Sequence, residues 1–83
     1  MPKPYARSQA LATTKLFLTE EIADTSPAGR LAVIARLEAA ARADRRRALK
    51  GHWTYDLSRH GHIARVLERE REALAAIEME EAA

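Results

Sequence analysis

The sequence predicts an all-α fold, in which a short N-terminal helix packs on a long antiparallel helical hairpin. Eighteen of the 83 residues are Ala, and Ala combined with Arg, Glu and Leu favours helices over sheets. Large apolar residues recur at three-to-four-residue spacing along most of the chain, as they do on the buried face of a helix. Turn-forming residues gather in two short stretches, 24–27 and 51–56, so three helices are expected.

The first helix is expected over about residues 5–24. Leu11, Leu18 and Ile22 form its apolar stripe, and Phe17 lies beside them. The same segment contains three Thr residues, which are mediocre helix formers because their β-branched side chains lose rotamer freedom. Packing against the hairpin must therefore help to hold this helix.

The second helix is expected over about residues 27–50, with specific signals at both ends. Ser26 can cap it by accepting a backbone N–H bond, and Pro27 suits the first helical position, where no donor is needed. Gly51 suits the left-handed residue that closes a helix. A helix of this length would extend for about 36 Å at 1.5 Å per residue.

The third helix is expected over about residues 57–81, after a loop at 51–56. Three residues near its start carry oxygen atoms that can cap it: Thr54, Asp56 and Ser58. A connection of about six residues favours an antiparallel hairpin, because it is too short to return the chain to the far end. Glu70 lies between Leu67 and Leu74 on the apolar stripe. It either interrupts the stripe or places its carboxylate near a basic partner.

Length and composition indicate one small helical domain spanning residues 1–83. The chain has no Cys, which excludes disulfides and thiolate chemistry and suits a cytoplasmic protein. It contains no secretion-signal core and no run near the roughly twenty apolar residues of a membrane span. We therefore expect a soluble, cytoplasmic protein that has no membrane partner.

Charge is distributed unevenly, although the formal net charge is only +2. Lys and Arg number five against four Asp and Glu in residues 1–41, seven against two in 42–65, and two against six in 66–83. An antiparallel hairpin collects the basic segment at the end that carries the loop and the acidic segment at the other end. The sequence thus predicts a molecule with one basic and one acidic end.

The basic segment supplies the candidate binding residues: Arg42, Arg46, Lys50, Trp53, Tyr55, Arg59 and Arg65. Arg42, Arg46 and Lys50 share one helical face at four-residue spacing. If the protein binds the phosphates of a nucleic acid, this stripe is the surface expected to contact them. The alternative is structural, because cations in the last turn of a helix stabilise it by about 0.3–1 kcal/mol each through its dipole.

Trp53 and Tyr55 also allow two interpretations. They can plug the end of the helical core with their polar atoms at the rim, which is the interpretation that the sequence favours, because a small domain gains from burying its few aromatic residues. They can instead form a stacking platform for a base, or anchors for another protein.

We predict no catalytic site, no metal and no cofactor or small-molecule substrate. Asp56 and His60 have the four-residue spacing of metal ligands, but a third ligand is hard to place because neighbouring His residues point to different sides of a helix. Ser58 and His62 are also four residues apart. Nothing near them predicts the strained turn or oxyanion donors that a nucleophilic serine needs.

These observations predict an adaptor or regulatory subunit that binds another protein through its apolar seam and the Trp-Tyr-Arg end of the hairpin. Self-association is expected as well, since Glu80 and Glu81 oppose the dipole at the end of a helix and the basic end of a second copy would cover them. The alternative is a small nucleic-acid-binding regulator that uses the basic end. No helix-turn-helix is recognisable.

Overall fold

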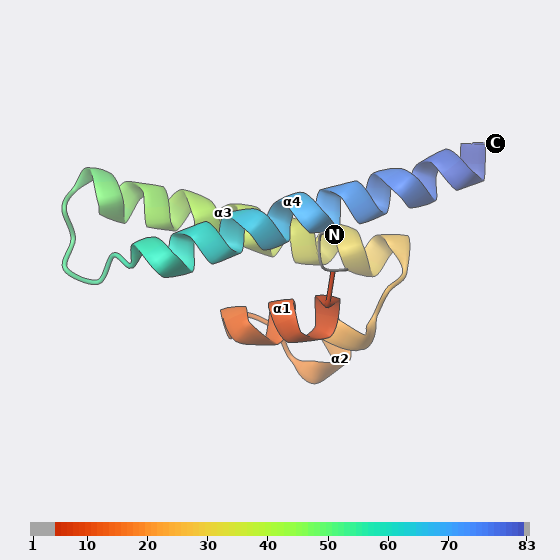
Figure 1. Ribbon diagram of the computed structural model, residues 1–83, viewed down its shortest axis with the longest axis horizontal. Coiled ribbons are helices and arrows are strands. Elements are labelled where there is room, and N and C mark those ends of the chain that lie inside the picture. Colours follow the sequence, from red (N-terminus) through yellow and green to blue (C-terminus); the bar gives the residue numbers. More distant parts are fainter. Residues whose placement is uncertain (1–4, 83) are drawn as a thin grey trace.

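The computed structural model describes residues 5–82, which form four α-helices and no strand (Figure 1). These helices are α1 (Arg7–Thr14), α2 (Thr19–Ala23), α3 (Pro27–Leu49) and α4 (Leu57–Ala82). The two long helices, α3 and α4, pack side by side as an antiparallel hairpin, and α1 and α2 lie together on one side of it. The predicted all-α class and the helical hairpin are confirmed.

The apolar core lies where α1 meets the hairpin. Leu11 of α1, Leu37 of α3 and Ile63 of α4 are fully buried, and full burial of such a side chain contributes about 1.5–3 kcal/mol relative to exposure. The remaining buried apolar residues come from the hairpin alone: Val33, Ile34, Val66, Leu67 and Leu74. The apolar seam of the hairpin is therefore occupied within the chain.

The prediction of one continuous helix over residues 5–24 is wrong. The chain ends α1 at Lys15, whose φ of 58° is left-handed, and begins α2 at Thr19. The Thr14 hydroxyl donates to the Leu11 carbonyl (2.7 Å) and accepts from the Leu16 N–H (3.3 Å). These bonds give backbone groups the partners that a continued helix would otherwise supply. A bend at this point folds α2 back beside α1.

The predicted ends of α3 are confirmed to within one residue. The Ser26 hydroxyl accepts from the Gly29 N–H (3.1 Å), and Pro27 is the first helical residue. Gly51 follows the helix with a φ of 62°, the left-handed conformation that Gly adopts without steric cost. Asp56 is the residue that caps α4, since its Oδ1 accepts from the Ser58 N–H at 2.9 Å.

Glu70 joins three helices through a buried cluster of charges. Its side chain is fully buried on α4 and accepts from Arg7 Nε of α1 (2.9 Å) and Arg30 Nη1 of α3 (3.3 Å). Burial and the neighbouring negative charge of Glu70 raise the pKa of Tyr5. The sequence left open whether Glu70 interrupts the apolar stripe or lies near a basic partner, and the structure shows that it has two such partners.

Arg30 and Arg36, near the start of α3, pair with residues of α4 and α2. Arg36 bonds Glu21 of α2 (2.8 Å), so it does not reach the C-terminal glutamates, and Arg30 is held by Glu70. Within residues 5–82, no helix combines the length and apolar character needed to cross a bilayer.

Candidate binding surface

The seven candidate residues lie at different places on the hairpin. Lys50, Trp53 and Tyr55 lie in or next to the connection (Figure 1). Arg65 lines a hollow with α1 residues, whereas Arg42 lines another hollow between α3 and α4. The structure therefore does not gather all seven candidates into one patch.

Trp53 is 88% exposed, so the predicted role of its ring as a plug for the core is wrong. The ring stacks on His52, with centroids 5.9 Å apart and planes at 21°. Tyr55 is half-buried, and its hydroxyl lies 3.0 Å from His60 Nδ1. The plug is unnecessary because the last buried apolar residue of α3 is Leu37, far from the turn.

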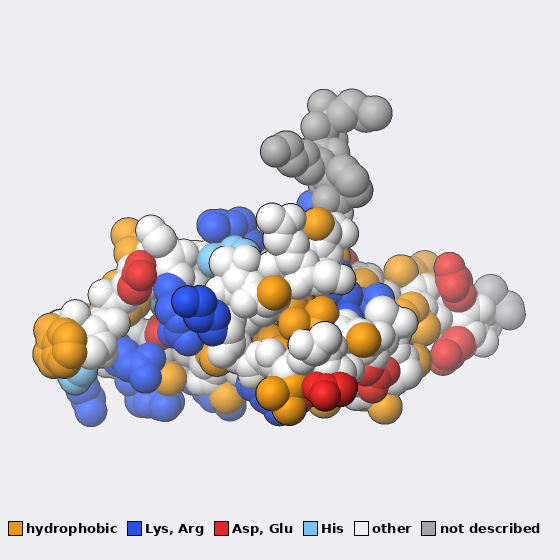
Figure 2. All heavy atoms as spheres, turned by 90° about the horizontal axis from the view of Figure 1, so that it is seen from below, with side chains coloured by type: hydrophobic (Ala, Val, Ile, Leu, Met, Phe, Trp, Pro, Cys, Tyr) orange, Lys and Arg blue, Asp and Glu red, His pale blue; other side chains and the backbone are white. Residues whose placement is uncertain are grey.

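Two other large apolar side chains are exposed near Trp53. Leu49, the last residue of α3, is 82% exposed, and Leu57, the first residue of α4, is 74% exposed. We call Leu49, Trp53 and Leu57 the apolar tip. The space-filling view shows hydrophobic side chains at this extreme of the molecule (Figure 2).

Two of the nearby cations have a structural role. Asp44 is only 2% exposed, and its carboxylate pairs with Arg47 (2.9 Å) and with Arg59 (3.1 Å) across the hairpin. One buried carboxylate therefore holds the end of α3 against the start of α4, and the candidate Arg59 forms part of this contact.

The other cations of the basic segment have no side-chain partner among residues 5–82. Among residues 5–82, six Lys and Arg side chains make no ion pair or hydrogen bond: Lys15, Arg42, Arg45, Arg46, Lys50 and Arg65. Five of these six lie in the basic segment, residues 42–65. Figure 2 shows most of the Lys and Arg side chains on the half of the molecule that carries the apolar tip, and most of the acidic side chains along the other half and at its end. The predicted separation of charge is therefore present on this face.

The histidines make separate contacts. His60 faces Tyr55, and His62 Nε2 lies 3.1 Å from the Ala10 carbonyl oxygen, joining α4 to α1. Asp56 is occupied in capping α4. Within the described part of the chain, no three His, Asp or Glu side chains come together as a possible metal site.

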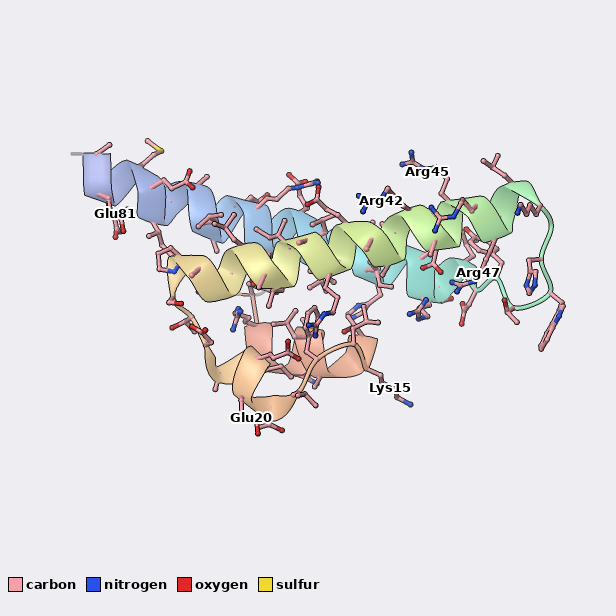
Figure 3. The ribbon with its side chains drawn as sticks, turned by 180° about the vertical axis from the view of Figure 1, so that it is seen from behind. Lys15, Glu20, Arg42, Arg45, Arg47 and Glu81 are labelled. Carbon is pink, nitrogen blue, oxygen red and sulfur yellow. The ribbon has the colours of Figure 1, made fainter. Side chains whose placement is uncertain are left out.

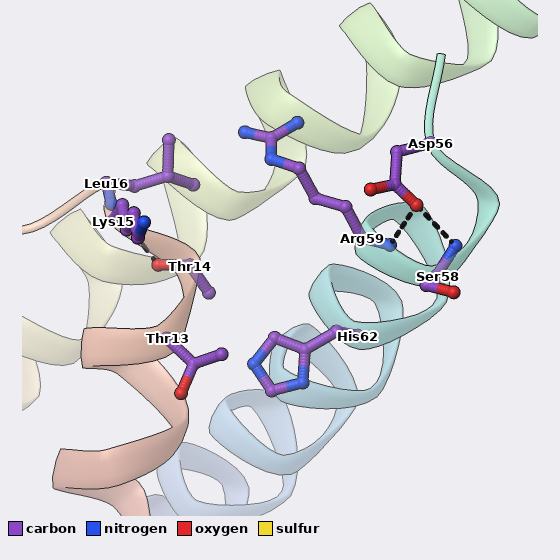
Figure 4. A pocket seen from close by; sticks show the side chains of 8 residues that line it. All are labelled: Thr13, Thr14, Lys15, Leu16, Asp56, Ser58, Arg59 and His62. Carbon is purple, nitrogen blue, oxygen red and sulfur yellow. Dashed lines mark hydrogen bonds between the residues drawn. The ribbon is translucent and has the colours of Figure 1, made fainter.

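A hollow of about 480 Å³ opens between the end of α1 and the start of α4 (Figure 4). It is lined by Thr13, Thr14, Lys15, Leu16, Asp56, Ser58, Arg59 and His62. In it, Asp56 faces the backbone N–H groups of Ser58 and Arg59, and His62 bonds α1. Ser58 and His62 thus share this hollow without forming a nucleophile and base pair.

No family model, no curated protein and no solved structure matches this chain. The geometry of its side chains is therefore the basis for assigning it a role.

Sequence reasoning missed three contributors to this surface, namely Leu49, Leu57 and Asp44. The signal for the two leucines was their position around the helices, because at 100° per residue each lies about 120° from the nearest buried apolar residue of its helix, Leu37 or Ile63. Asp44 carried a weaker signal. It is one of only two acidic residues among the seven cations of segment 42–65.

Proposed function

We propose that this protein is a non-catalytic binding module that docks on a partner protein through the apolar tip of its hairpin. One observation carries the proposal, namely that Trp53 is 88% exposed between Leu49 and Leu57, which are 82% and 74% exposed. Scattered single apolar residues on a surface are ordinary, but a group of three at one protruding end is typical of an interaction site.

Trp53 has the properties of an energetic anchor. A Trp side chain buries about 150–250 Å², and Trp is among the residues most enriched at binding hot spots. Burial of about 200 Å² at 25 cal/mol per Å² is favourable by about 5 kcal/mol before the cost of association is subtracted. This single ring can therefore dominate the affinity of a complex.

The charges next to the tip indicate the chemistry of the partner. Arg46 and Lys50 lie in the last turn of α3 and its cap, and neither has an ionic partner within residues 5–82. A complementary surface would combine an apolar pocket for Trp53 with acidic residues on its rim. Such charges mainly speed association and select the partner, while the ring supplies the affinity.

Recovery of the tagged protein from its native cells, with and without nuclease, tests this function. We expect a nuclease-resistant protein partner that is lost with Trp53→Ala, although the variant melts like the unmodified protein. Leu18→Ala is the matched control, because Leu18 is another exposed apolar side chain (67% exposed) and lies before α2, away from the tip. Retention of the partner by Trp53→Ala would contradict the proposal.

A nucleic-acid-binding role is the second candidate, favoured by the stripe of Arg42, Arg46 and Lys50, which has no ionic partner in the part of the chain that the structure describes. Contacts to four or five phosphates would make log affinity for duplex DNA fall with log salt at a slope of about −4. Replacement of the three residues by Ala should then abolish binding, and unchanged affinity would exclude this role. The small net charge of +2 and the apolar character of the tip favour the protein partner.

A further inference from the structure

Another hollow of about 480 Å³ lies between α1 and α4, next to the one in Figure 4, with which it shares Thr13 and His62. We call it the Arg65 hollow. Its polar and aromatic lining comes from both sides, namely from Tyr5, Gln9, Thr13, His62, Arg65 and Arg69. Small-molecule sites usually have volumes of about 300–1,000 Å³, so the Arg65 hollow is large enough to hold a small ligand.

The α4 side of the hollow is basic. His62, Arg65 and Arg69 follow one another at intervals of three and four residues, so at about 3.6 residues per turn they project from one face of the helix. None of the described residues that line the hollow is Asp or Glu. The lining therefore attracts negative charge and contains no carboxylate that would compete for it.

Arg65 brings hydrogen-bond donors that are not used within the described chain. Its side chain forms no ion pair or hydrogen bond among residues 5–82. A Cβ atom at Gly61 would lie 3.3 Å from Arg65 Nη1, so the guanidinium folds back along α4 toward the turn that carries His62. The lack of a side chain at Gly61 gives the guanidinium this place beside the hollow.

The two neighbours of Arg65 on this face are held by other contacts. The guanidinium carbon of Arg69 lies 5.8 Å from the centre of the Tyr5 ring, and its Nη1 lies 3.9 Å from Glu72. His62 Nε2 lies 3.1 Å from the Ala10 carbonyl oxygen. Because a carbonyl oxygen can only accept, Nε2 carries a proton in this contact. These contacts fix the wall of the hollow around Arg65.

The α1 side offers neutral polar groups beside apolar surface. The side-chain amide of Gln9 makes no hydrogen bond within the described residues. The Thr13 hydroxyl donates to the Gln9 backbone carbonyl (2.8 Å), and its oxygen can still accept a bond. Ala6 and Ala10 complete this side. The two sides together suit a ligand that combines a charged group with a small apolar part.

We propose that the Arg65 hollow binds a small organic anion, whose phosphate or carboxylate group pairs with Arg65 and whose apolar part contacts α1. The planar guanidinium of Arg65 presents parallel N–H donors that match two oxygens of either group. The positive charge of Arg69 strengthens the attraction, and the Gln9 amide is placed to orient the ligand. Trp53 does not line the hollow, so this site does not depend on the proposed partner of the apolar tip.

Titration with phenyl phosphate, benzoate and phenol, followed by the NMR signals of the backbone amides, tests the site. These probes share a ring and differ in the charged group. We expect at least one of the two anions to shift the signals of Gln9, Thr13 and Arg65, and phenol to leave them unchanged. The anion that binds more tightly identifies whether the site prefers a phosphate or a carboxylate.

Arg65→Gln should weaken this binding by at least about tenfold, because it removes hydrogen bonds between charged groups. The variant should melt like the unmodified protein, since Arg65 is exposed and has no partner among residues 5–82. Arg45→Gln is the matched control. It removes the same charge from another exposed arginine, which Figure 3 shows on the side of α3 that faces away from α1, and it should bind the anion like the unmodified protein.

Trp53→Ala should also bind the anion normally, which separates this test from that of the proposed function. Three results would each overturn the proposal. They are an unmodified protein that binds neither anion, phenol that binds as well as the anions, and Arg45→Gln that weakens binding as much as Arg65→Gln does.

Discussion

Replacement of Glu70 should be among the most destabilising single changes in the protein. Glu70 is fully buried and accepts from Arg7 at 2.9 Å and Arg30 at 3.3 Å, whose side chains are only 11% and 14% exposed. Glu70→Ala leaves both cations without their anion, and loss of one member of a buried ion pair costs about 3–5 kcal/mol. A domain of 83 residues is stable by about 4–12 kcal/mol, so this change removes a large share of the free energy of unfolding.

Urea unfolding at neutral pH, followed by helical circular dichroism, measures this loss. Glu70→Gln keeps the volume and one acceptor oxygen, so its loss should be smaller than that of Glu70→Ala. Glu68→Ala is the control, because Glu68 is exposed on the same helix, and its effect should stay within about 0.5 kcal/mol. A loss below about 1 kcal/mol for Glu70→Ala would refute the reasoning, since it would mean that the two arginines find water or other partners at little cost.

Three further outcomes follow from local geometry. Trp53→Ala should change the free energy of unfolding by less than about 0.5 kcal/mol in a thermal melt, because the ring is exposed; a larger loss would show that it stabilises the fold. Gly51→Ala should cost about 1 kcal/mol in urea unfolding because φ is positive there, whereas Gly61→Ala within α4 should stabilise by about 0.5–1 kcal/mol. Hydrogen bonds from Arg36 and the Leu18 backbone hold the pKa of Glu21 below its usual value, so its stabilising contribution is present at neutral pH and is lost as the pH falls through the lowered pKa. The difference in stability between the unmodified chain and Glu21→Gln should therefore shrink in acid, and a constant difference would contradict this.

The hairpin was predictable because its boundaries depend on local chemistry. Ser26 and Pro27 begin α3, and Gly51 closes it with a left-handed residue, and each of these roles follows from one side chain or its absence. The antiparallel arrangement follows in turn from the short connection between the two long helices.

The break at Lys15 and the exposure of Trp53 were not predictable in the same way. The Thr14 hydroxyl can bond the backbone whether the helix continues or ends there. Which of the two occurs depends on how α1 docks on α4, which is a tertiary contact. The position of the core depends on the same docking. Because Leu11 is buried in the core that the two long helices share, the apolar core ends before the turn. Nothing in the sequence near Trp53 indicates where the core ends.

The contact between Arg7 and Glu70 also determines when the fold can be completed during synthesis. These residues are 63 positions apart, so at about 5–20 residues per second a ribosome adds Glu70 roughly 3–13 s after Arg7. Until α4 has been added, α1 lacks the helix of the hairpin that it contacts, and Leu11 and Leu37 lack the α4 residues that bury them. The nascent chain therefore exposes its future core for seconds, a period in which a chaperone that binds apolar segments would have access to it.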